Sequence, residues 1–171
     1  PVVAAAVVLR PEGIPPGLDD SKKLSPARRQ ALFAQLQACA DIGVGIIGVA
    51  QIDRDNILNA TLAAMRQAVD QLSTQATMVL VDGNRLPELG CAGRAIVGGD
   101  GRSLSIAAAS IVAKVTRDAI MDELNTQFPA FGWQRNRGYG TAEHLDALKT
   151  HGPCIHHRRS FRPVREALEH I

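Results

Sequence analysis

Cysteine is scarce in this sequence, and its three cysteines, Cys39, Cys91 and Cys154, lie far apart. An odd number of scattered thiols without a CxxC pair excludes a disulfide-framed domain and indicates reduced cysteines. Long apolar runs are also missing, because no stretch is long enough to span a membrane and no signal-peptide pattern is present. We therefore expect a cytoplasmic protein without membrane contact.

Charged residues make up only 21% of the 171 residues, and 46% are hydrophobic. This composition excludes disordered and fibrous classes and predicts one domain with a core of ordinary size. The net charge of +2 is uninformative, but residues 133–165 carry five more basic than acidic side chains. That excess is typical of a surface that attracts nucleic-acid phosphates, although a solvated basic tail explains it equally well.

Strand and helix patterns alternate along the chain. Continuous apolar runs predict strands, and Ser25 followed by Pro26 predicts a helix start. The alternation predicts an α/β sheet whose later strands are parallel. We expect strands at 1–9, 42–50, 77–82 and 94–97, and helices from Pro26, at 53–73, at about 103–128 and from Thr141 to Gly152.

The strand in TMVLVDGN, residues 77–84, runs from apolar residues straight into Asp82. In open α/β sheets, chemistry gathers at the carboxyl ends of parallel strands. A carboxylate there is costly unless it is compensated, and Mg²⁺ is commonly held by one or two carboxylates plus phosphate oxygens. The alternative is that Asp82 only caps its own turn with Gly83 and Asn84.

A second candidate carboxylate, Asp118, follows a run of small residues at 107–113 that would let a helix lie close against a sheet. Such packing could bring Asp118 near Asp82. A surface ion pair with Lys114 or Arg117 is the competing interpretation.

Two other site types have weaker support. The cluster at Cys154, His156 and His157 lacks a second ligand pair at zinc spacing. The GGDGR segment at 98–102 is not a GxGxxG signature, so a small-molecule enzyme with a phosphate-cradling loop stays open only as a minor alternative.

Five segments together resemble bacterial ribonuclease HII, the type 2 ribonuclease H. Each is weak alone, but they occur in matching order and spacing over essentially the whole chain. They are DDSKKLSPARR at 19–29, VDGN at 81–84, GGDGRSLSIAAASIVAKVTRD at 98–118, RGYGTAEHLDALKTHG at 137–152 and HHRRSF at 156–161.

The resemblance implies a ribonuclease H-like fold, with a mixed five-stranded sheet flanked by helices. It implies an endonuclease that hydrolyses the RNA strand of RNA/DNA hybrids and cleaves 5′ of ribonucleotides embedded in duplex DNA. The family uses four carboxylates and Mg²⁺ or Mn²⁺, and Asp82 and Asp118 would be the third and fourth. A two-metal site needs such clustered anionic ligands.

The same resemblance suggests substrate-binding residues. Tyr139 would pack its ring on the sugar after the ribonucleotide, although a half-buried core tyrosine is the alternative. Ser21 and Lys22 belong to a loop near the scissile phosphate, and Arg158 and Arg159 would lie beside the nucleic-acid backbone. Asp100 and Arg102 also fall in a matching motif, without an assigned role.

One family motif is missing. In the family, a DEAGRG strand carries the first two carboxylates and lies between the strands that correspond to residues 1–9 and 77–82. Its absence from this sequence suggests an N-terminal truncation, two half-sheets with unpaired facing edges, and an inactive chain.

We expect one monomeric domain over residues 1–171, with a helical substrate-binding part at about 129–171. A non-catalytic module that binds RNA/DNA hybrids is the main alternative function.

Overall fold

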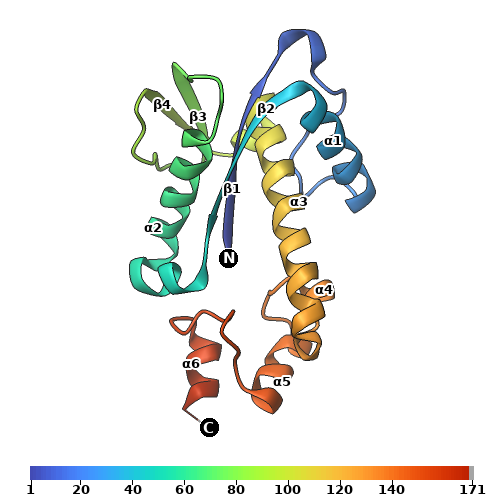
Figure 1. Cartoon of the computed structure of the whole chain (residues 1–171), viewed down its shortest axis with the longest axis vertical. Coiled ribbons are helices and arrows are strands. Elements are labelled where there is room, and N and C mark those ends of the chain that lie inside the picture. Colours follow the sequence, from blue (N-terminus) through green and yellow to red (C-terminus); the bar gives the residue numbers. More distant parts are fainter. Residues whose placement is uncertain (170–171) are drawn as a thin grey trace.

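The computed structural model describes residues 1–169 and has an α/β architecture in which the long helix α3 links the strands to the C-terminal helices (Figure 1). All predicted helices and strands are present with shifted ends, and α4 and α6 were not predicted. The strands are β1 (Val2–Leu9), β2 (Ala40–Ile47), β3 (Met78–Asp82) and β4 (Ala92–Ile96). The helices are α1 (Pro26–Cys39), α2 (Val49–Asp70), α3 (Leu104–Gln127), α4 (Trp133–Asn136), α5 (Ala142–His151) and α6 (Arg162–Leu168), with short 3₁₀ turns η1 (Pro11–Gly13), η2 (Gly99–Gly101) and η3 (Pro129–Phe131).

The strands form two separate pairs. β1 and β2 are antiparallel, from Val2 opposite Ile47 to Leu9 opposite Ala40. β3 and β4 are parallel, as predicted for the later strands, and Asp82 lies opposite Ile96. Within residues 1–169 no strand joins the two pairs.

An apolar slot of about 450 Å³ lies between β1 and β3. It is lined by residues 3–9 of β1 and 78–82 of β3, together with Met65 and Val69 of α2 and Ala109 of α3. The facing edges of β1 and β3 pair with no other strand in the described part of the chain. Open edges of this kind are ready to pair with a further strand.

Glycines in β2 let α2 approach closely. A Cβ atom on Gly43 or Gly45 would lie 1.9 Å from the main-chain oxygen of Ala68 or Ala64, respectively. Ala60, Ala64 and Ala68 recur every four residues and are fully buried, so they form the α2 face that packs on β2.

The C-terminal part, residues 129–169, has a hydrophobic cluster of its own around Trp133. Met121 of α3, Phe131, Leu148 and Val164 pack into it. Thr141 caps α5 as predicted, because its hydroxyl accepts a hydrogen bond from the His144 N–H at 3.3 Å. The last two residues of the predicted 129–171 part lie outside the described residues.

Among residues 1–169, no helix is both long enough and apolar enough to cross a membrane.

Candidate functional site

Asp82 ends β3 and is tied to η2. Its Oδ1 accepts a hydrogen bond of 2.8 Å from the N–H of Gly99. The Gly83 N–H donates to the Ile96 carbonyl of β4 at 2.9 Å. The Asp82 side chain therefore bonds across to η2, rather than only to its own turn.

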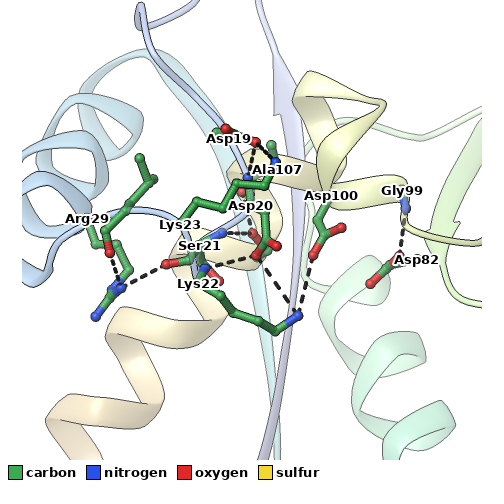
Figure 2. Close-up of polar contacts among 12 residues, drawn as sticks. Asp19, Asp20, Ser21, Lys22, Lys23, Arg29, Asp82, Gly99, Asp100 and Ala107 are labelled. Carbon is green, nitrogen blue, oxygen red and sulfur yellow. Dashed lines mark hydrogen bonds and ion pairs between the residues drawn. The ribbon is translucent and has the colours of Figure 1, made fainter.

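Asp100 follows directly in η2, and its side chain is only 13% exposed. Its Oδ2 lies 3.6 Å from Nζ of Lys22. Figure 2 shows the carboxylates of Asp82 and Asp100 on the same side of η2, with the Lys22 ammonium approaching Asp100. The structure thus gives Asp82 a second carboxylate as a neighbour. That neighbour is Asp100 and not the predicted Asp118.

The loop that carries Lys22 is held from both sides. Ser21 is buried, and its N–H donates to Oγ of Ser110 at 3.4 Å. Its carbonyl accepts from Arg29 at 2.8 Å, and Arg29 also donates to the Leu24 carbonyl at 2.6 Å. Of the two predicted loop residues, Ser21 therefore anchors the loop, and Lys22 faces the carboxylates.

Asp118 does not join this group, which corrects the predicted pairing with Asp82. It lies on α3 fourteen residues after Leu104, so it is about 21 Å along the helix axis from the end that adjoins η2. There it forms an ion pair of 2.9 Å with Lys114. The small residues of α3 do pack closely, but the part of α3 near Asp82 is its N-terminal end.

Tyr139 lies in the C-terminal part, with 63% of its surface exposed. The guanidinium of Arg117 lies 5.5 Å from the centre of its ring. Both residues line a cavity of about 290 Å³, together with Arg158 and His156. Tyr139 is therefore available to a ligand, and it is not the half-buried core residue of the alternative interpretation.

A buried histidine, His144, holds the main chain of Tyr139, and a second buried histidine, His157, contacts His144. Nδ1 of His144 lies 3.0 Å from the Tyr139 carbonyl, which can only accept, so this nitrogen carries a proton. Nε2 of a neutral His144 then accepts from Trp133 Nε1 at 3.2 Å and from His157 Nε2 at 3.1 Å. Nδ1 of His157 in turn accepts from the Cys154 N–H at 3.1 Å.

This network requires neutral histidines. Burial, and secondarily the neighbouring His144, lowers the pKa of His157 to about 4. Both ring nitrogens of His157 already have partners, so the Cys154 cluster does not offer a zinc site.

The basic side chains around Tyr139 differ in environment. Nη1 of Arg117 is buried without a hydrogen-bond partner within residues 1–169. Arg158 lines the cavity, with its guanidinium 5.1 Å from the Phe161 ring centre, and Arg159 is exposed outside it. The predicted Arg158 thus lies beside Tyr139. Arg117 lies there too, although the sequence alone suggested only a surface ion pair for it.

No group of three or more histidine, cysteine, aspartate or glutamate side chains in the described chain is placed to hold a metal ion. Asp82 and Asp100 offer two carboxylates with a basic side chain beside them. Oxygen ligands of this type suit Mg²⁺ or Mn²⁺, which also bind phosphate oxygens and water. The pair therefore fits part of a metal site.

Comparisons with known proteins agree on one family. The family model described as Ribonuclease HII matches residues 1–164. A ribonuclease HII from Paramagnetospirillum magneticum is 58% identical over 172 residues, covering 98% of this chain and 86% of the relative. Another from Xanthobacter autotrophicus is 56% identical over 166 residues, covering 97% of this chain and 67% of the relative.

Solved structures support the same fold. The ribonuclease H2 from Pyrococcus horikoshii OT3 matches with a TM-score of 0.78 at 23% identity, covering 99% of this chain and 92% of that one. A structure of the PCNA:RNase HII complex from Archaeoglobus fulgidus matches with a TM-score of 0.72 at 22% identity, covering 96% of this chain and 88% of that one. The predicted ribonuclease H-like fold is confirmed.

Proposed function

This chain belongs to the ribonuclease HII family and so to the ribonuclease H enzymes, and from that premise we propose a metal-dependent endonuclease. It would hydrolyse the RNA strand of RNA/DNA hybrids and cleave 5′ of ribonucleotides embedded in duplex DNA. The observation that carries the proposal is the meeting of Asp82, Asp100 and Lys22 at the end of β3.

Asp82 and Asp100 would hold Mg²⁺ or Mn²⁺ through carboxylate oxygens. A bound ion of this kind supplies Lewis-acid activation of water and of the scissile phosphate. Asp82 is oriented by the Gly99 N–H, and Asp100 by its ion pair with Lys22. Lys22, whose side chain is 80% exposed, can leave Asp100 to contact a phosphate oxygen.

The cavity at Tyr139 would receive the substrate next to the ribonucleotide. The exposed ring can pack on a deoxyribose, where an added 2′-hydroxyl would disturb the contact. The unpartnered Nη1 of Arg117 and the guanidinium of Arg158 suit phosphate oxygens, and Arg159 adds a more distant positive charge. Buried His144 holds the Tyr139 main chain in place for this contact.

The slot between β1 and β3 supports a further part of the proposal. An extended segment with two more carboxylates would complete the sheet there, since its main-chain groups can pair with both open edges. We propose that residues 1–171 alone are inactive without such a strand. We also propose a cytoplasmic, monomeric enzyme that acts in replication and DNA repair.

The test is a nicking assay on a labelled duplex that contains one ribonucleotide. Residues 1–171 would be compared with the same chain extended before Pro1 by the family's DEAGRG strand. We expect Mg²⁺-dependent cleavage 5′ of the ribonucleotide by the extended chain only. A folded extended chain that does not cleave would contradict the enzyme proposal, and cleavage by residues 1–171 would contradict their inactivity.

The remaining alternative is a module that only binds hybrids. It is favoured by the C-terminal part, whose hydrogen-bonded network is already assembled in this chain. It predicts hybrid binding by the extended chain that neither Mg²⁺ nor Asp82→Asn changes, together with no cleavage.

A further inference from the structure

The first turn of α2 is set apart from the rest of that helix. Asn56 interrupts it with φ 68° and ψ 167°, a backbone conformation that is otherwise almost confined to glycine. Its Oδ1 accepts from the N–H groups of Leu58 and Asn59 at 3.0 and 3.1 Å, so Asn56 caps the helix that follows. Residues 49–55 therefore form a short helical turn with its own orientation.

Asp53 in this turn binds a segment more than one hundred residues away. Its Oδ2 accepts from the Arg159 N–H at 2.8 Å. Its Oδ1 accepts from the Ser160 N–H at 3.0 Å and from the Ser160 hydroxyl at 2.6 Å. Three donors on one carboxylate define the position of this segment.

The charge state of Asp53 reflects these contacts. Burial alone would raise its pKa, but the hydrogen bonds from Ser160 and Arg159 and the nearby charge of Arg158 outweigh it. The pKa of Asp53 is held below its usual value, so the carboxylate stays ionised at neutral pH.

Asp53 is also the link between the segment and the N-terminal elements. Within the described residues, all hydrogen bonds from residues 153–161 to the chain before α3 end on Asp53. The other bonds of this segment stay within the C-terminal part, such as Phe161 N–H to the Arg158 carbonyl at 3.1 Å. Arg158, which directly precedes the two residues bound by Asp53, lines the cavity of Tyr139.

We infer that Asp53 is a positioning residue that holds residues 158–160 so that Arg158 faces the nucleic-acid backbone beside Tyr139. The inference rests on the proposed function for the role of Arg158. Asp53 itself, being anionic and enclosed by donors, would not touch the substrate.

The test compares Asp53→Ala with Asp55→Ala in the full chain. Asp55 is the matched control, because it lies two residues on and pairs with its neighbour Arg54 at 2.9 Å. Binding of a labelled RNA/DNA hybrid would be measured over a series of salt concentrations. Hydrogen exchange at the Arg159 and Ser160 amides would be measured in parallel.

For Asp53→Ala we expect roughly tenfold weaker binding and a salt dependence shallower by about one unit, as for the loss of one phosphate contact. Exchange at the two amides should rise by about tenfold or more, while β1 and β2 amides keep their protection. Asp53→Asn should be intermediate, since one amide oxygen can still accept from Ser160. Asp55→Ala should match the unaltered chain.

A double variant separates positioning from general stability. If Asp53 acts through Arg158, adding Asp53→Ala to Arg158→Ala should weaken binding no further. Additive losses, or faster exchange with unchanged binding, would overturn the inference. An unaltered chain that does not bind the hybrid would instead contradict the proposed function, which keeps the two failures distinguishable.

Discussion

The two ends of α3 differ in how completely their polar groups are paired. At the C-terminal end, His144 and His157 bond to Trp133, to the Tyr139 carbonyl and to each other, in a buried chain. At the N-terminal end, the Asp82 carboxylate accepts a hydrogen bond from the Gly99 N–H, and Asp100 forms an ion pair with an exposed lysine side chain.

This difference fits what each end is proposed to do. A surface that recognises a sugar must be rigid, so its supports are buried and paired. Metal ligands must keep lone pairs available, so carboxylates at the other end are oriented by few donors. In this chain, the C-terminal end of α3 that is proposed for substrate recognition (the recognition end) already has its supporting hydrogen bonds. The end with the carboxylates adjoins the open slot between β1 and β3.

The largest expected change in cleavage rate concerns the two carboxylates, Asp82 and Asp100. In the extended chain, Asp82→Asn or Asp100→Asn should lower the cleavage rate by about a thousandfold or more, because each removes an anionic metal ligand. Hybrid binding without metal should change little. Single-turnover cleavage with saturating enzyme would measure the effect.

Asp118→Asn is the matched control on the same fold. Since Asp118 pairs with Lys114 away from η2, cleavage should stay within about twofold of the unaltered chain. A loss as large as that of Asp82→Asn would restore the original assignment of Asp118 and remove Asp100 from the proposed metal site.

At the recognition end, Tyr139→Ala should lower cleavage at a single embedded ribonucleotide by roughly tenfold to a hundredfold, if packing on the sugar contributes as much as the about 1–3 kcal/mol of a ring stacked on a base. Thermal stability should be unchanged, because the ring is 63% exposed. Tyr139→Phe keeps the ring and should keep the activity. Equal losses for both variants would show that the hydroxyl, rather than the ring face, is required.

The sequence predicted these two ends unequally. The strand ending at Asp82 was predicted from a local pattern, a buried strand that meets a carboxylate, whereas Tyr139 was proposed only through a family motif. Asp100 lies in the GGDGR motif, but its pairing with Lys22 joins two loops that no periodicity connects.

Asp118 shows the opposite limit of sequence reasoning. The small residues of α3 correctly indicated close packing, but they could not show which end of the helix would meet Asp82. Two other features had no sequence signal, because their contacts depend on tertiary packing. The hydrogen bond between Asp53 and Arg159 spans 106 residues, and the contact between His144 and His157 spans 13.

The histidine network gives the recognition end a pH dependence. The pKa of His157 is about 4 in the folded chain and near 6.5 when unfolded. Between pH 6.5 and 4 the unfolded chain therefore binds a proton that the folded chain does not, so the free energy of unfolding falls as pH falls through this window. We expect a loss of roughly 2 kcal/mol, less than the full shift implies, because a protonated ring can draw water into the cluster.

Chemical denaturation at several pH values would measure this loss. His157→Gln should be less stable at pH 7 and should flatten the dependence between pH 6.5 and 4. His151→Gln, at an exposed position of α5, should leave the curve unchanged. An unaltered slope in His157→Gln would show that another group titrates in this window.

The smallest expected effect is on Mn²⁺ binding, and it should differ between the neighbouring loop residues Lys22 and Lys23. Lys22 approaches Asp100, whereas Lys23 pairs with Asp19 at 3.0 Å, and that hydrogen bond raises the pKa of Lys23. A metal ion at Asp100 must displace the Lys22 ammonium, so Lys22→Ala should tighten Mn²⁺ binding by up to about fivefold, the scale of an exposed ion pair. The same change should slow cleavage, since the ammonium is no longer available to the phosphate. Lys23→Ala should alter neither quantity, and a Lys22→Ala chain that binds Mn²⁺ more weakly would mean that Asp100 is not a metal ligand.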